Sequence, residues 1–126
     1  MSKIKIAIIG AGPAGLMAAQ VLSDAGCSPT VFDAKPSAGR KFLQAGRGGL
    51  NLTHSEDFSL FCSRYFEAQT FLQPALENFS PDDIRSWAMN LGFETFVGSS
   101  GKVYPLDKKS APLLRTWLHK LKANNT

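Results

Sequence analysis

The chain has 126 residues, 44% of them hydrophobic and 19% charged, which is typical of one globular domain and excludes a disordered chain. Its formal net charge is +4, without the basic stripe and interleaved aromatic residues that bind nucleic acid. A glycine turn breaks the N-terminal apolar run after Ile9, which excludes a membrane span there. We therefore expect a cytoplasmic protein without nucleic-acid or membrane partners.

The first predicted element is an apolar strand that leads directly into a glycine turn. Residues 4–9 have the composition of a parallel strand covered on both faces. The turn has the spacing Gly-x-Gly-x-x-Gly and consists of Gly10, Ala11, Gly12, Pro13, Ala14 and Gly15. In such a turn the first glycine allows the bend, the second lets the backbone approach a pyrophosphate, and the third lets the helix pack near the strand. The anion would bind the positive N-terminus of that helix.

A largely buried helix and a second strand follow the turn. The helix is predicted to begin near Pro13 and to end at Gly26. The strand, residues 30–32, ends at Asp33, and this acid lies 18 residues after Gly15, close to the usual spacing of about 20. A carboxylate there can bind both hydroxyls of an adenosine ribose and would repel a 2′-phosphate. The alternative is a glycine turn in another kind of α/β protein, with Asp33 a solvated loop residue.

Residues 34–55 are predicted to form a long loop, and long ordered loops tend to be functional. The loop contains flexible glycines and positive charges, namely Gly39, Gly46, Gly48, Gly49, Arg40, Lys41 and Arg47. Such a loop could close over an anionic cofactor. A mobile surface loop explains the composition equally well.

Helices and a hairpin are predicted after this loop. The capping-box pattern of residues 53–56 predicts a helix start, and a helical run over 67–79 kinks or restarts at Pro74. Ser80 predicts a further helix start. Residues 93–97 and 102–105 are expected to pair as strands, and a last helix begins near Ser110.

Few residues suggest a disulfide, a metal site or acid–base catalysis. Cys27 and Cys62 have no Cys-x-x-Cys partner, so two free thiols are expected. His54 and His119 are too far apart for a local metal motif, and we expect no metal site. The sequence assigns no general acid or base.

The glycine turn, the strand end at Asp33 and, above all, residues 39–54 resemble the bacterial BaiN-like flavoproteins, which are NAD(P)/FAD-dependent oxidoreductases. Residues 96–105 and 111–114 are similar to one branch of that family. The resemblance implies FAD, with its pyrophosphate at the glycine turn and its ribose at Asp33 and Ala34, although many related flavoproteins have glutamate in place of Asp33. It also implies NAD(P)H as the electron donor of the complete enzyme.

The same resemblance implies that part of the long loop extends along the cofactor toward the flavin. The residues concerned are Arg40, Lys41, Gly46, Gly48, Gly49 and Asn51. Arg40 and Lys41 would compensate phosphate charge, and Asn51 would bind near the flavin or order the loop. His54 would lie near the flavin ring or belong only to the following helix start.

These observations predict an α/β fold, a Rossmann-like FAD-binding domain with an incomplete parallel sheet and a helical segment after the second strand. Residues 1–53 would form the dinucleotide-binding start and cofactor loop, and residues 54–126 the helices, hairpin and final crossover helix. Because the family's members have several hundred residues, we expect the chain to be their N-terminal part and to be inactive alone.

The complete enzyme would transfer hydride between a reduced nicotinamide and an organic acceptor, a small molecule that the sequence does not name. Two alternatives remain open, a non-catalytic ADP- or NAD-binding module and an inactive fragment.

Overall fold

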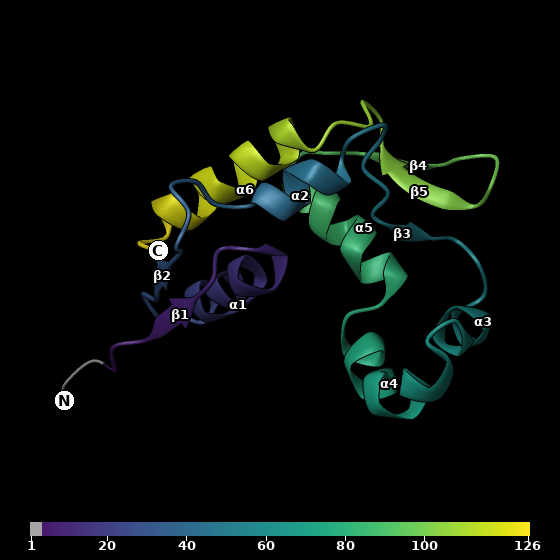
Figure 1. Cartoon of the computed structure of the whole chain (residues 1–126), viewed down its shortest axis with the longest axis horizontal. Helices are drawn as coiled ribbons and strands as arrows, with labels where there is room; N and C mark the ends of the chain where they lie inside the picture. Colours follow the sequence, from purple (N-terminus) through teal and green to yellow (C-terminus); the bar gives the residue numbers. More distant parts are fainter. Residues whose placement is uncertain (1–3) are drawn as a thin grey trace. The chain divides into compact units, whose positions relative to one another are not determined.

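The computed structural model describes residues 4–126, which form two compact units (Figure 1). One unit contains the chain up to Arg47 together with Ser110–Thr126, and the other contains Gly48–Lys109. The last helix therefore belongs with the N-terminal segment, from which it is remote in sequence. The units are described separately below.

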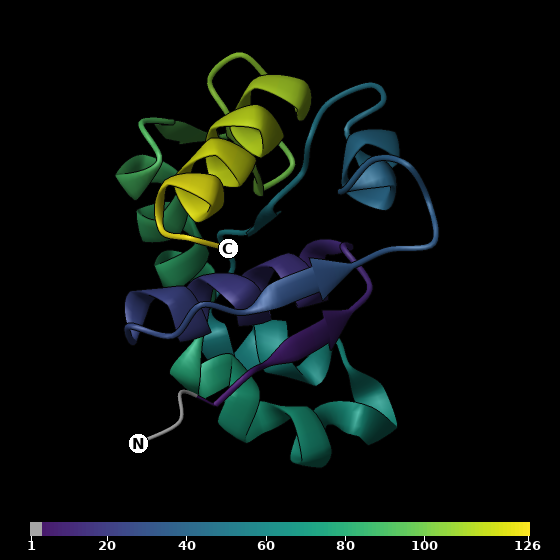
Figure 2. The ribbon, with the colours of Figure 1, turned by 90° about the vertical axis from the view of Figure 1, so that its left-hand side faces the viewer.

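The first unit begins with a βαβ arrangement, as predicted. Strands β1 (Ala7–Ile9) and β2 (Thr30–Phe32) are parallel, with Ile8 opposite Val31, and helix α1 (Pro13–Asp24) connects them. Figure 2 shows the two strands side by side with α1 next to them. Because parallel neighbours require a crossover connection, this pairing creates the strand–turn–helix junction of a Rossmann fold.

The expectation that the first strand is covered on both faces is wrong. Ile9 is 83% exposed and Phe32 53% exposed. The reason is that this sheet has two strands in residues 4–126, so neither is central. Helix α1 is likewise less buried than predicted, since Val21 on its outer face is 61% exposed, whereas Leu16 and Ala19 are buried.

The expectation of a loop over residues 34–55 is also wrong in part. Its middle forms a short helix, α2 (Arg40–Ala45), which packs against α6 (Ala111–Ala123). Phe42 of α2 contacts Trp117 of α6 edge to face, with ring centroids 6.0 Å apart. This apolar contact stabilises a helix that is too short to form alone.

Two loop glycines are explained by the same packing. Gly39 has a φ of +70°, and a Cβ atom there would lie 2.6 Å from Leu114 Cδ1. At Gly46, a Cβ atom would overlap the side chain of Ser110. Both positions let α6 approach α2 closely, and Trp117 Nε1 also donates a 2.8 Å hydrogen bond to Gln20 Oε1 on α1.

The second unit contains helices and a three-stranded antiparallel sheet of order β3-β5-β4. Its elements are β3 (Thr53–His54), α3 (Phe58–Ser63), the 3-10 helix η1 (Phe66–Ala68), α4 (Gln69–Asn78), α5 (Pro81–Asn90), β4 (Thr95–Val97) and β5 (Lys102–Pro105). The predicted hairpin of β4 and β5 is confirmed, and the pairing of β3 with β5 extends it.

The predicted helix starts had different outcomes. The helix start at Thr53 is wrong, because Thr53 pairs with Val103 in the sheet, and Asp57 caps α3 instead through hydrogen bonds from Ser59 and Leu60. The start at Ser80 is confirmed as a capping box with Asp83. Pro74 lies inside α4 without ending it.

Two further observations concern the described residues as a whole. Cys27 is partly buried and Cys62 is buried, and both are free thiols. Among the helices of residues 4–126, none combines the length and apolar character needed to cross a bilayer.

Candidate nucleotide-binding site

The three glycines of the first turn have different physical roles. Gly10 has a φ of +105°, which favours glycine, and its N–H donates a 2.7 Å hydrogen bond to Phe32 O. A Cβ atom at Gly15 would overlap the carbonyl oxygen of Gly10. Gly12 differs from both, because its φ of −82° is ordinary and a Cβ atom there would have no atom within 4 Å. Packing among residues 4–126 therefore does not explain a glycine at position 12.

Helix α1 begins at this turn with its backbone donors available. Gly12 is the N-cap residue and makes no side-chain cap hydrogen bond, and Pro13 occupies the first helical turn. The first amides of a helix have no intrahelical acceptor, and the helix dipole adds positive potential at this end. The turn is therefore suited to an anion such as a pyrophosphate.

Asp33 at the end of β2 faces this turn. Its Oδ2 accepts a 2.7 Å hydrogen bond from Ala11 N, and its Oδ1 accepts one of 2.7 Å from Lys35 N. These two bonds, the one from Ala11 first, hold the pKa of the carboxyl group below its ordinary value, and Arg40 contributes a smaller effect in the same direction. Asp33 is therefore an anion whose position is fixed by the backbone.

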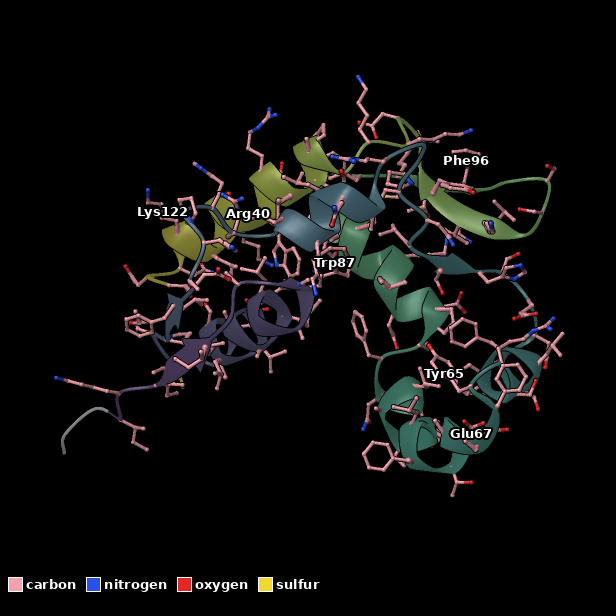
Figure 3. All side chains as sticks on the ribbon, in the orientation of Figure 1. Arg40, Tyr65, Glu67, Trp87, Phe96 and Lys122 are labelled. Carbon is pink, nitrogen blue, oxygen red and sulfur yellow. The ribbon has the colours of Figure 1, made fainter. Side chains whose placement is uncertain are left out.

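A cleft of about 350 Å³ lies between the turn and the segment after β2. Its lining residues come from the turn, the end of β2 and the start of α2, and they are Ala11, Gly12, Asp33, Lys35, Ser37, Gly39, Arg40 and Lys41. Gly39 N joins the two sides through a 2.7 Å hydrogen bond to Ala11 O. Figure 3 shows Arg40 at the start of α2. The structure thus brings the glycine turn, the acid and two cations of the sequence prediction into one cleft.

Other predicted site residues lie elsewhere. Ala34 is exposed and does not line the cleft, and Gly46 packs against Ser110. Gly48, Gly49 and Asn51 belong to the second unit. With its amide oriented to satisfy both of its neighbours, Asn51 donates hydrogen bonds to Thr53 O at 2.8 Å and Val103 O at 3.3 Å. Both acceptors belong to the second unit, as Asn51 does.

Lys35 and Ser37 are cleft residues that the sequence analysis missed. The available signal was their position directly after Asp33, at the carboxyl end of a parallel strand, where ligands bind in open α/β sheets.

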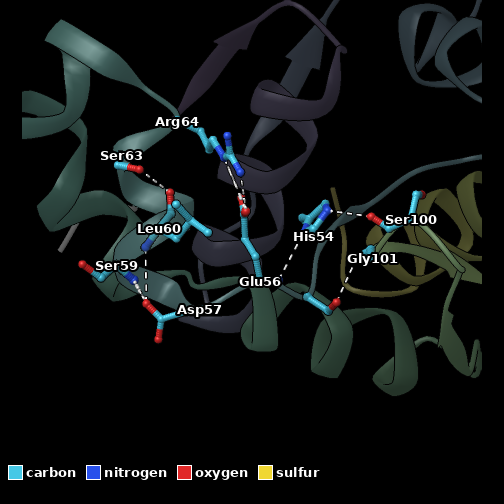
Figure 4. Close-up of polar contacts among 10 residues, drawn as sticks. His54, Glu56, Asp57, Ser59, Leu60, Ser63, Arg64, Ser100 and Gly101 are labelled. Carbon is cyan, nitrogen blue, oxygen red and sulfur yellow. Dashed lines mark hydrogen bonds and ion pairs between the residues drawn. The ribbon is translucent and has the colours of Figure 1, made fainter.

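His54 makes two hydrogen bonds inside the second unit (Figure 4). Its Nδ1 accepts from Glu56 N at 3.0 Å, so its Nε2 carries the proton and donates to Ser100 O at 3.1 Å. Glu56 also forms an ion pair with Arg64 at 3.1 Å. His54 lies in β3 and not at a helix start. Its hydrogen bond to Ser100 O connects that strand to the β4–β5 turn.

The βαβ unit and the unhindered glycine turn define a nucleotide-binding Rossmann domain. Residues 4–126 match the HI0933-like protein Rossmann domain, so the chain belongs to that family, which is of the flavoprotein type. A ribosomal RNA dihydrouridine synthase of Haemophilus influenzae is 51% identical over 49 residues, which make up 39% of this chain and 12% of the relative. The chain thus matches only a small part of that relative's length.

Proposed function

We propose that the chain binds FAD at the glycine turn and is the N-terminal portion of a BaiN-like flavin-dependent oxidoreductase. The observation that carries this proposal is the open space at Gly12, where neither φ nor packing against the described residues requires a glycine. A pyrophosphate that must approach the backbone closely supplies the missing reason.

The cleft residues suit the two ends of an ADP moiety. The α1 N-terminus and the cations of Arg40 and Lys41 would neutralise the phosphates. Each carboxylate oxygen of Asp33 accepts one backbone hydrogen bond and retains a second lone pair. The acid can therefore still bind the ribose hydroxyls.

In the complete enzyme, FAD would supply hydride chemistry, and the protein would orient the flavin and exclude competing reactions. We propose NAD(P)H as the donor and an organic compound as the acceptor. No general acid or base is assigned to this chain.

A second candidate concerns the substrate of the complete protein. The relative from Haemophilus influenzae is named for an action on ribosomal RNA, and dihydrouridine formation is a reduction. A groove of about 550 Å³ on α2, lined by Ser37, Arg40, Leu43, Gln44 and Arg47, carries the exposed guanidinium group of Arg47, which is suited to a phosphate and is not assigned to FAD. RNA would then replace the small-molecule substrate expected from the sequence.

FAD titration of the purified chain, followed by calorimetry and flavin absorbance, tests the first proposal. Gly12→Val should retain the wild-type circular dichroism, because the site is open, but lose FAD affinity at least tenfold, because the side chain occupies the phosphate position. Ala18→Val, at an exposed site on the same helix, is the control and should bind normally. FAD binding that is equal in all three proteins contradicts the assignment.

Two other outcomes separate the alternatives. A colourless chain that binds ADP or NAD but not FAD supports a non-catalytic module. Binding of a uridine-containing RNA oligonucleotide that Arg47→Glu weakens, while Arg115→Glu on α6 does not, supports the RNA candidate.

A further inference from the structure

The middle of the glycine turn is fixed by the side chain of Asp33. Ala11 is 5% exposed and lies between Gly10 and Gly12, and its N–H donates to Asp33 Oδ2 at 2.7 Å. A hydrogen bond from an amide to a carboxylate is short and strong because the acceptor is charged. The bond therefore restrains the peptide plane between the first two glycines.

Three contacts hold this turn together before any ligand binds. Besides the bond to Asp33, Gly10 N donates to Phe32 O and Ala11 O accepts from Gly39 N, each at 2.7 Å. Of the three, only the contact with Asp33 involves a side chain, so it is the one that a substitution can remove. The amides of the first turn of α1 are left for a ligand.

We propose that Asp33 is a positioning residue whose carboxylate holds the glycine turn ready for a pyrophosphate, a role separate from any contact with ribose. Without this acceptor, the nearly buried Ala11 amide would be unsatisfied, and the turn would rearrange to pair it. Asparagine is a poor substitute, because its single amide oxygen can accept from Ala11 or from Lys35 but not from both, and a neutral acceptor binds the Ala11 amide more weakly than a carboxylate does. The inference rests on the proposed function, since it concerns the same phosphate site.

Inorganic pyrophosphate is the probe that separates the two roles, because it has no ribose. If Asp33 served ribose alone, Asp33→Asn would leave pyrophosphate affinity unchanged or raise it, since a negative charge near the phosphates is removed. If Asp33 holds the turn, the same variant should bind pyrophosphate at least tenfold more weakly. Only the turn-holding role thus predicts a loss of pyrophosphate affinity.

Asp107→Asn is the matched control. Asp107 also accepts a hydrogen bond from the backbone amide two residues later, Lys109 N at 3.0 Å, and its substitution changes the net charge equally. It belongs to the second unit and should leave pyrophosphate affinity unchanged. Equal or tighter pyrophosphate binding by Asp33→Asn, or an equal loss in Asp107→Asn, overturns the proposal.

NMR of the wild-type chain tests the same contact even if Asp33→Asn does not fold. The Ala11 amide resonance should move as Asp33 titrates in acid, and a resonance that does not move overturns the proposal. Wild-type protein that binds pyrophosphate but not FAD contradicts only the proposed function. Wild-type protein that binds no pyrophosphate contradicts this inference as well.

Discussion

Gly15→Ala should destabilise the fold, whereas Gly12→Ala in the same turn should not. A Cβ atom at Gly15 would overlap Gly10 O, would lie 3.0 Å from Gly10 C, and would contact Ile8 Cγ2 at 3.4 Å. Backbone atoms cannot rotate away as a side chain does. Helix α1 must therefore move away from β1 to admit one methyl group.

The expected cost follows from this geometry. Overpacking of a rigid site costs about 1–3 kcal/mol, out of a typical total stability of roughly 5–15 kcal/mol. The upper part of the first range applies, because the clash is with backbone. At Gly12 the added methyl group meets no atom within 4 Å, so the stability should change by less than about 0.5 kcal/mol.

Urea unfolding followed by circular dichroism measures both variants, and FAD titration follows on the folded proteins. We expect Gly15→Ala to lower the unfolding midpoint and Gly12→Ala to leave it in place. Equal stability of the two variants would refute the assignment of Gly15 to helix–strand packing. A larger loss of stability in Gly12→Ala than in Gly15→Ala would refute the conclusion that the space around Gly12 is open.

Three further predictions concern a cap, a core residue and the acid. Ser80→Ala should lower the free energy of unfolding by about 1 kcal/mol, because it removes the capping box of α5, while Ser86→Ala on the exposed side of that helix should not. Trp117→Ala should cost about 3–5 kcal/mol in urea unfolding, because the side chain is 1% exposed and joins α6 to α1 and α2. The pKa of Asp33 in the folded protein lies below its unfolded value of 3.8, because backbone hydrogen bonds stabilise the carboxylate. These bonds contribute fully to the free energy of unfolding above pH 3.8, and the contribution is lost as the pH falls through the folded pKa. Asp33→Asn should therefore flatten the acid side of the stability profile, and an unchanged acid side would contradict the bonding described.

The local elements followed from short-range signals. The strand and helix around the glycine turn, the cap at Ser80 and the hairpin of β4 and β5 all depend on residues close together in the sequence. The helix start predicted at Thr53 was wrong, because Thr53 pairs with Val103. This strand partner is remote in the sequence, and the capping-box pattern of residues 53–56 does not indicate it.

The candidate site was predictable in its residue types but not in its contacts. The spacing of Gly10–Gly15 and Asp33 indicated a phosphate turn and an acid. The bond between Asp33 and Ala11 depends on the register of β1 and β2, in which Ile9 lies opposite Phe32, and no local pattern encodes that register.

By itself, then, the sequence determined a strand, a glycine turn, a helix and an acid in the order that a nucleotide-binding Rossmann domain requires. Tertiary structure decided how the glycines are used. Gly39 and Gly46, which composition assigned to a flexible cofactor loop, are required because α6 returns to pack on α2. Gly12, in contrast, has no partner within the described chain, since its φ is ordinary and its surroundings are open. Only a folded backbone separates a glycine needed for packing from one that leaves room for a ligand.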